Sequence, residues 1–361
     1  MSPPVPTPPW LLRIPSVFDG LESGLLEDAR LDLVRSVGAE YRLVRPTAPS
    51  TFPDPRTAGF FPWRLPVEHS WPCSPAKTDG FVEKAAQALA ARFGSRGART
   101  VLVGSLDGGS AGSPSRKLAS NLRGRSLQLV EGTESIRDVE ALDPTAPVLY
   151  AMVGKAGLFA GIASPREANG FHPGGEKFIK AGGISRAGGK IAGALHHLRL
   201  FHEPPARGAH WLELGASPGG MTAELLERGY QVTAVDRAPL DERLRGAAGL
   251  TEVHADVLHF HAPSGHRYDA ILCDMNGDPR DSMRGVLRLL PSLESGGLVV
   301  FTLKLATEER LARIHALTGE VLAAAERSGL ALLSLTHLPA NRREFTCLFL
   351  HGTPDFDPAR A

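Results

Sequence analysis

The chain has 361 residues, a formal net charge of +1, 42% hydrophobic residues and 22% charged residues. This composition is that of an ordinary globular protein, and the length allows one to three domains with a sizeable core. The nearly neutral charge neither requires nor excludes a nucleic-acid partner.

The three cysteines, Cys73, Cys273 and Cys347, are too few and too far apart for a disulfide framework or a zinc site. We therefore expect a reducing, cytoplasmic environment and no metal. The N-terminus has no basic start before a long apolar run, and no stretch of about 18 residues is apolar. The sequence predicts neither a signal peptide nor a membrane span.

Residues 1–165 are predicted to form an α+β region. The first 75 residues hold 14 of the 29 prolines, so they cannot be mostly helical. Hydrophobic spacing predicts two helices and three strands in the rest of the region. The helices cover residues 81–94 and 113–122, and the strands cover residues 99–106, 126–132 and 147–154. The glycine-rich residues 166–184 predict a linker.

A basic segment within this region suits RNA binding. Residues 81–130 contain eight lysines or arginines against Glu83 and Asp107, a local net charge of +6. Such a cluster fits contacts to phosphates, although a solvated protein face is an equally good interpretation. The aromatic residues at 60–64 and Trp71 could stack on bases. A place in the hydrophobic core is the interpretation that we favour for them.

From residue 185 onward, strands and helices alternate. Predicted strands cover residues 209–215, 230–236, 250–256, 267–275 and 296–305, and predicted helices cover residues 189–201, 219–229, 280–293 and 307–329. Residues 330–351 predict a terminal hairpin. This order predicts an α/β fold with a mostly parallel sheet covered on both faces, to which the hairpin adds one antiparallel strand. We place this domain at residues 185–353, followed by a tail at 354–361.

A glycine-rich turn between the first strand and helix of this domain indicates a cofactor site. The loop Gly215–Gly220 lets a ligand approach the backbone and the first N–H groups of a helix. Asp236 ends the next strand, where a carboxylate can accept hydrogen bonds from both hydroxyls of a ribose, and Asp256 ends the third. The loop lacks the GxGxxG spacing that binds a dinucleotide pyrophosphate. A turn with a purely geometric role, and a solvated Asp256, are the alternatives.

Four charged residues are predicted to meet at the carboxyl ends of the strands. Asp274 and Lys304 end otherwise apolar strands, Lys190 begins the first helix, and Glu344 opens the last strand. Buried charges are costly unless they are paired or functional. Surface roles as a snorkelling lysine, a helix-start charge or an edge-strand acid are the alternatives for Lys304, Lys190 and Glu344.

The choice of lysine is informative because the chain has only 8 lysines against 32 arginines. A lysine can accept a proton if burial and a second cation lower its pKa from about 10.4 towards about 7–8, whereas an arginine stays protonated. We predict that Lys304 is a base or positions a hydroxyl, that Asp274 and Glu344 orient it, and that Lys190 tunes the electrostatic field.

These motifs resemble those of the FtsJ-type ribose 2′-O-methyltransferases, whose hallmark is a Lys-Asp-Lys-Glu tetrad. Residues 185–190 (SRAGGK) resemble the stretch with the first lysine, and 214–220 (LGASPGG) resemble the loop that binds S-adenosylmethionine. Residues 273–275 (CDM), 303–305 (LKL) and 343–346 (REFT) match the other three positions. The order and spacing of all five agree.

The resemblance implies a class I, Rossmann-like methyltransferase that transfers a methyl group from S-adenosyl-L-methionine to a ribose 2′-hydroxyl of RNA. It is strongest to the RlmM type, which acts on a cytidine of large-subunit (23S) ribosomal RNA and carries an RNA-binding, THUMP-containing portion before the catalytic domain. Met221 replaces the family's usual tryptophan, and residues 1–165 show no THUMP pattern. The cofactor-binding residues that the resemblance implies are Gly215, Ser217, Pro218, Gly219, Gly220, Met221, Asp236, Asp256 and Asp274.

Two other functions stay open at this point. A catalytically silent RNA-binding or ribosome assembly factor could retain the same fold, although the intact tetrad disfavours it. A methyltransferase acting on a base or a protein is the second alternative. It is disfavoured because Asp274-Met275-Asn276-Gly277 stands where an NPPY-type tetrapeptide would be, and because no cysteine pair suits carbon methylation.

Overall fold

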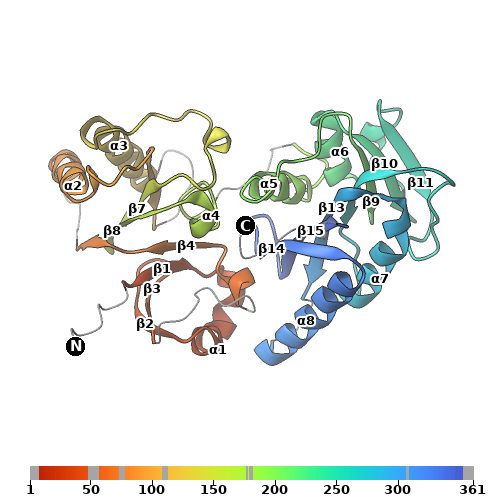
Figure 1. The fold of residues 1–361 in the computed structure, drawn as a ribbon, viewed down its shortest axis with the longest axis horizontal. Coiled ribbons are helices and arrows are strands. Elements are labelled where there is room, and N and C mark those ends of the chain that lie inside the picture. The colour runs from red at the N-terminus through yellow and green to blue at the C-terminus, as the bar shows by residue number, and fades with distance from the viewer. Residues whose placement is uncertain are drawn as a thin grey trace. The chain divides into compact units, whose positions relative to one another are not determined.

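The computed structural model describes residues 8–47, 57–72, 78–107, 113–175, 178, 182–305 and 309–352. The chain divides into two compact units, Met1–Gly175 and Glu176–Ala361, which run from red to yellow-green and from green to blue in Figure 1. The division falls inside the interval 166–184. Cys73 and the predicted tail at 354–361 lie outside the described residues. In the described part, no helix is long and apolar enough to cross a bilayer.

The N-terminal unit contains two four-stranded sheets among its described residues. The first is antiparallel, in the order β2-β3-β1-β4, with strands β1 (Trp10–Arg13), β2 (Leu31–Ser36), β3 (Tyr41–Pro46) and β4 (Trp63–Pro66). The second has the order β5-β8-β7-β6, with strands β5 (His69–Trp71), β6 (Val101–Ser105), β7 (Val148–Gly154) and β8 (Gly157–Ala163). Strands β6 and β7 are parallel, and the other pairs are antiparallel.

The helices of this unit are α1 (Glu22–Asp28), α2 (Thr78–Phe93), α3 (Pro114–Leu129) and α4 (Pro165–Ala168), with the 3-10 turns η1 (Ser16–Leu21), η2 (Ala58–Phe60) and η3 (Val139–Ala141). Helices α2 and α3 share a buried core with the second sheet. The predicted strand at 126–132 is wrong, because α3 continues to Leu129. Leu118, Leu122 and Ser126 are buried at a spacing of four residues, which is the repeat of a helix and not of a strand.

The basic segment 81–130 is partly neutralised within its own unit. Four of its eight cationic side chains have partners there: Arg96 with Glu68, Arg99 with Glu134, Arg123 with the carbonyl oxygens of Val101 and Ile136, and Arg125 with Glu83. These four cations thus take part in contacts of the unit itself, and RNA binding by the segment stays a prediction.

The aromatic residues of the first unit belong to its core, as their composition favours. Phe60, Phe61 and Trp63 are at most 1% exposed. Trp71 is half-buried and stacks on Phe81, with ring centroids 5.6 Å apart. The three buried rings offer no surface to a base.

The C-terminal unit is a seven-stranded sheet in the order β11-β10-β9-β12-β13-β15-β14. Its strands are β9 (His210–Leu214), β10 (Gln231–Asp236), β11 (Leu250–His254), β12 (Tyr268–Cys273), β13 (Leu293–Lys304), β14 (Leu330–Thr336) and β15 (Glu344–His351). Its helices are α5 (Gly188–Leu198), α6 (Gly220–Glu227), α7 (Pro279–Leu289) and α8 (Leu311–Arg327), with the 3-10 turns η4 (Glu242–Leu244) and η5 (Leu290–Ser292). The predicted Rossmann-like fold with a terminal hairpin is confirmed.

The position of β15 decides where the charged residues lie. The strands from β11 to β13 are parallel, whereas β15 pairs antiparallel with both β13 and β14. The start of β15 therefore lies beside the end of β13, and Glu344 is the direct cross-strand partner of Lys304. Asp274 follows the end of β12, so three charges reach the same edge of the sheet.

We predict that Gly161→Ala destabilises the N-terminal unit. A methyl group at Gly161 in β8 would overlap the carbonyl oxygen of Pro66. Only a residue without a side chain leaves room for that oxygen. Overpacking of this kind costs about 1–3 kcal/mol of unfolding free energy. Gly124→Ala in α3 is the control, because its added methyl meets nothing within 4 Å and should stabilise the helix by up to about 1 kcal/mol. Scanning calorimetry that shows equal shifts for both variants would contradict the prediction.

Candidate active site

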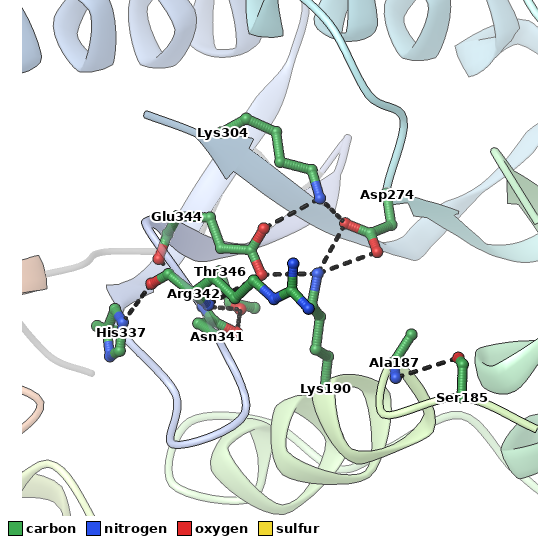
Figure 2. Close-up of polar contacts among 10 residues, drawn as sticks. All are labelled: Ser185, Ala187, Lys190, Asp274, Lys304, His337, Asn341, Arg342, Glu344 and Thr346. Atoms are coloured by element: carbon green, nitrogen blue, oxygen red, sulfur yellow. Dashed lines mark hydrogen bonds and ion pairs between the residues drawn. The ribbon is translucent and has the colours of Figure 1, made fainter. Parts of the chain in front are cut away.

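Four charged side chains form a closed ring at the carboxyl edge of the sheet. The Lys190 amine lies 3.1 Å from Asp274 Oδ2 and 2.6 Å from Glu344 Oε1. The Lys304 amine lies 2.6 Å from Asp274 Oδ1 and 3.0 Å from Glu344 Oε2. Figure 2 shows the two amines and two carboxylates alternating, with Lys190 rising from α5. The structure thus brings together all four residues that the sequence predicts to meet.

The ring is largely shielded from solvent and carries no formal net charge. The exposed fractions of the four side chains are 14% for Lys190, 15% for Asp274, 18% for Lys304 and 5% for Glu344. Removing one partner from such a set leaves an uncompensated buried charge, which is strongly destabilising. Each of the four residues therefore depends on the other three.

The two lysines differ in how their donors are used. A protonated lysine has three N–H donors. The Lys190 amine contacts both oxygens of Asp274 and one oxygen of Glu344. The Lys304 amine contacts one oxygen of each carboxylate, so within the described residues it keeps one donor for another group. The geometry therefore leaves room for a further acceptor oxygen at Lys304.

The charges of the ring reinforce one another. Burial alone would lower the pKa of Lys304, but the Asp274 and Glu344 carboxylates outweigh it and raise that pKa above its ordinary value. Burial alone would raise the pKa of Glu344, but the two lysines bring it below its ordinary value. The two carboxylates therefore favour the protonated form of Lys304, and its role as a proton acceptor stays a prediction.

The turn before β15 holds Glu344 in place (Figure 2). The Arg342 N–H donates to Glu344 Oε1 at 3.3 Å, and the Asn341 side chain donates to the Glu344 carbonyl oxygen and to Thr346 Oγ1. His337 Nε2 lies 2.8 Å from the Arg342 carbonyl oxygen. These bonds fix a carboxylate that sits at the very start of its strand.

The glycine loop lies where β9 passes into α6, beside the start of α5. Gly215 and Gly219 have φ angles of +80° and +102°, a backbone region that favours glycine. A Cβ at Gly220 would overlap the Ser185 hydroxyl, and one at Gly188 would lie 2.8 Å from the Gly220 carbonyl oxygen. The segment with Lys190 and the glycine loop are thus packed backbone against backbone.

The predicted cofactor-binding side chains are arranged around this loop. Asp236 accepts hydrogen bonds from the N–H groups of Ser217, at 3.0 Å, and Ala238, at 2.9 Å. The Ser217 hydroxyl donates to the Pro239 carbonyl oxygen at 3.0 Å. Asp236 therefore ties the end of β10 to the loop, and the Ser217 side chain shapes the loop itself.

Two further predicted residues have different surroundings. The Met221 side chain is 3% exposed and belongs to the hydrophobic core of the unit. Asp256 is more open: it accepts from the Leu258 N–H at 2.9 Å and lies 4.0 Å from an Arg237 nitrogen. The Leu258 N–H, followed by Arg237 and His259, lowers the pKa of Asp256.

Residues 184–326 match the family model of the FtsJ-like methyltransferases. This segment, the FtsJ-like domain, is therefore similar to that family. Ribosomal RNA large subunit methyltransferase M of Halorhodospira halophila is 34% identical over 134 residues, which are 36% of this chain and 38% of that protein. The protein of the same name from Shewanella loihica is 26% identical over 218 residues, or 58% of this chain and 59% of that protein. The matches therefore span less than two thirds of either relative.

Solved structures with similar folds include a fibrillarin pre-rRNA processing protein of Methanococcus jannaschii. It has 14% sequence identity and a TM-score of 0.38, over 56% of this chain and 83% of that chain. TrmN of Thermus thermophilus has 17% identity and a TM-score of 0.35, over 95% of this chain and 99% of that one. The strand order of the FtsJ-like domain, and not these low scores, carries the fold assignment.

A fifth charged residue of the FtsJ-like domain escaped the sequence prediction. Glu213 lies in β9, is 3% exposed, and accepts a hydrogen bond from the Thr222 hydroxyl of α6 at 2.7 Å. Burial, with smaller effects of the Asp274 and Asp236 carboxylates, raises the pKa of Glu213 to about 8 against the opposing Thr222 bond. The sequence does contain a signal for this residue, because Glu213 is an acid within the apolar run WLELG. A charged residue in an apolar run was also the signal that identified Asp274 and Lys304.

We predict that Glu213→Gln makes the protein more stable relative to wild type as the pH rises. Between its ordinary pKa of 4.5 and about 8, Glu213 keeps in the folded state a proton that the unfolded state releases. Wild-type stability contributed by this group therefore falls with rising pH across that window, by a total on the order of 5 kcal/mol. Denaturant unfolding at several pH values tests this, and parallel curves for the two proteins would contradict it.

Proposed function

We propose that this protein transfers a methyl group from S-adenosylmethionine to a ribose 2′-hydroxyl of RNA. The observation that carries the proposal is the ring of Lys190, Asp274, Lys304 and Glu344 inside a domain that matches the family model of the FtsJ-like methyltransferases. A ribose hydroxyl is a weak nucleophile at neutral pH, so the reaction needs alignment and an exit for its proton.

The loop after β9 fits S-adenosylmethionine. The loop Gly215–Gly220 exposes backbone at the carboxyl end of a parallel strand, where ligands of open α/β sheets bind. Each oxygen of Asp236 accepts one backbone N–H, which orients the carboxylate and leaves acceptor capacity for the two hydroxyls of a ribose. Asp256, at the end of the next strand, is the candidate for the adenine amino group. When bound, this cofactor supplies a methyl group on a positively charged sulfur.

Lys304 is the residue that positions the substrate in this proposal. Its remaining N–H donor holds the 2′-oxygen while the Asp274 and Glu344 carboxylates fix the amine. The oxygen–carbon bond forms as the sulfur–carbon bond breaks, and the hydroxyl proton leaves. Because the two carboxylates favour the protonated form of Lys304, that proton passes to a neighbouring carboxylate or to water. Lys190 keeps both carboxylates charged and in place.

Large-subunit ribosomal RNA, at a cytidine ribose, is the proposed substrate. The names of the two relatives given above refer to the RNA of the large ribosomal subunit, and the sequence motifs resemble the RlmM type. The N-terminal unit is proposed to contribute to RNA recognition. RNA extracted from cells with and without the gene, mapped for 2′-O-methylation, would identify the nucleotide.

We predict that Asp236→Ala weakens S-adenosylmethionine binding roughly ten- to hundredfold. The change removes hydrogen bonds to a charged acceptor, each with about 1.5–3 kcal/mol of stabilisation. Asp256→Ala should have a smaller effect because its carboxylate is more exposed. Titration calorimetry measures both, and an unchanged affinity of the Asp236 variant would remove this residue from the cofactor site. Tighter binding of NADH than of S-adenosylmethionine would refute the proposed function.

We predict that Lys304→Arg lowers the rate of methyl transfer by about 10²-fold or more in a single-turnover assay, the cost of misplacing reacting groups by about 1 Å. Arginine keeps the charge but replaces a compact amine with a planar group that cannot occupy the same ring. Cofactor affinity should barely change, and Lys190→Arg should cost less. An equal loss of cofactor binding and rate would show that Lys304 is structural.

The pH dependence of this variant separates the two roles of Lys304. With the pKa of Lys304 raised, the amine stays protonated across neutral pH, so the ratio of wild-type to variant rates should be constant from about pH 6 to about pH 9. A ratio that rises with pH would show that the neutral amine acts as the proton acceptor.

A further inference from the structure

The connection from β11 to β12, residues 255–267, crosses the sheet without regular structure. Strand β11 is the outermost strand, and β10 and β9 lie between it and β12. The structure describes the whole connection, which contains turns but no helix or strand. A connection of this length without secondary structure of its own is uncommon and often functional. Contacts with other elements must therefore fix its shape.

The first turn of this connection, residues 256–260, contains the acid proposed for the adenine amino group. The Asp256 side chain accepts a hydrogen bond from the Leu258 N–H at 2.9 Å. The Asp256 carbonyl oxygen accepts one from the His259 N–H, also at 2.9 Å. The direction of the Asp256 carboxylate thus depends on the shape of these five residues, which we call the Asp256 turn.

The side chain of Arg288 holds the Asp256 turn from outside. Arg288 lies in the last turn of α7, and its Nη1 donates to the Phe260 carbonyl oxygen at 2.5 Å. Its Nη2 donates to the Val257 carbonyl oxygen at 2.9 Å. Because both donors belong to one planar guanidinium, they fix the two carbonyl groups relative to each other. A lysine has a single nitrogen and cannot bridge the two oxygens in the same geometry.

The same face of α7 packs against the Asp256 turn. Gly285 lies three residues before Arg288, so the two positions are neighbours on the helix surface. Gly285 is buried, and a Cβ there would lie 3.5 Å from Leu258 Cδ2 and 3.9 Å from Val257 Cγ1. The turn therefore lies close to the helix backbone at Gly285 and is hydrogen-bonded to the side chain at Arg288.

Helix α7 also connects the Asp256 turn with the charged ring. Its N-cap is Asp278, which follows closely after Asp274, and its last turn contains Arg288. The Asp278 side chain accepts a hydrogen bond from the Arg280 N–H at 2.8 Å, which fixes the start of the helix. One helix thus begins beside a member of the ring and ends at the turn that contains Asp256.

We propose that Arg288 is a positioning residue for the cofactor, which holds the Asp256 turn in the shape that binds the adenine end of S-adenosylmethionine. The proposal rests on the proposed function for the identity of the cofactor. Arg288 touches neither the cofactor nor the RNA in this proposal and acts only through the turn.

The test compares Arg288→Gln with Arg284→Gln. Both arginines are exposed and lie on α7, but Arg284 pairs with Asp281 of its own helix. The full-length variants are titrated with S-adenosylmethionine by calorimetry, and their kcat and cofactor KM are measured on large-subunit ribosomal RNA from cells without the gene. Arg288→Lys, Asp256→Ala and the double variant Arg288→Gln with Asp256→Ala complete the set.

We expect Arg288→Gln to raise the Kd for S-adenosylmethionine roughly three- to tenfold, the scale of one or two hydrogen bonds, and Arg288→Lys to raise it less. The cofactor KM should rise by the same factor while kcat stays within about twofold, since the charged ring is unchanged. Arg284→Gln should leave all three quantities unchanged.

Two further measurements separate positioning from a general loss of structure. In the Asp256→Ala background, Arg288→Gln should have almost no further effect on affinity, because it acts through Asp256. Amide hydrogen exchange of Leu258 should become faster in Arg288→Gln, whereas exchange in α6 should not change.

Equal affinities of Arg288→Gln and Arg284→Gln would overturn the proposal, as would additive effects of the Arg288 and Asp256 changes. A fall in kcat as large as the rise in KM would also overturn it. If Arg288→Gln does not fold, the same comparisons are made with Arg288→Lys, which keeps one donor for the turn. Wild-type protein that does not bind S-adenosylmethionine would refute the proposed function, whereas binding that is insensitive to Arg288 would refute the positioning role alone.

Discussion

The neutral ring of two lysines and two carboxylates is the constraint on which the C-terminal unit depends. Its members come from the start of α5, the ends of β12 and β13, and the start of β15. Four elements far apart in the sequence must reach one edge of the sheet, because no buried member is tolerable without its partners. Only an antiparallel β15 next to β13 brings Glu344 opposite Lys304. A parallel strand in that place would carry the carboxylate to the other edge.

The same ring assigns different tasks to chemically identical side chains. Lys190 contacts three oxygens of the two carboxylates, whereas Lys304 contacts two and has a donor left. Two carboxylates next to one amine also raise its pKa, which changes the chemistry expected from the sequence. Two nearby lysines suggested mutual lowering of the pKa. The carboxylates that the sequence also predicted outweigh that effect once their distances are known.

The sequence predicted the C-terminal unit well because its signals are local. Each buried strand is a short apolar run, each helix follows within a few residues, and parallel order is implied by the alternation. Charged residues at the ends of apolar runs then marked the edge of the sheet. Glu213 was passed over because it lies inside its run and not at the end, although the cost of burying it is the same.

The N-terminal unit was less predictable because its pairings are not local. Strand β4 pairs with β1, and β5 pairs with β8, although long stretches of chain separate the partners. The sequence contains no local signal for such pairings. Residues 126–132 have a composition that suits a strand, yet the buried face of α3 continues through Ser126 and keeps them helical as far as Leu129. The conformation of such a short segment depends more on the helix to which it is attached than on its own composition.

Counting charges along the sequence also gave an incomplete account of what its positive residues do. The basic segment 81–130 could be an RNA contact or a solvated face by its sequence, and four of its cations contact carboxylates or carbonyl oxygens of their own unit. From residue 184 onward lysine occurs only at positions 190 and 304, both in the ring, although arginine is four times as frequent in the chain as a whole. A compact amine can approach a single hydroxyl oxygen, whereas the broad, permanently charged guanidinium cannot take its place. The composition bias of the chain therefore marks the two residues proposed to act at the reacting atom.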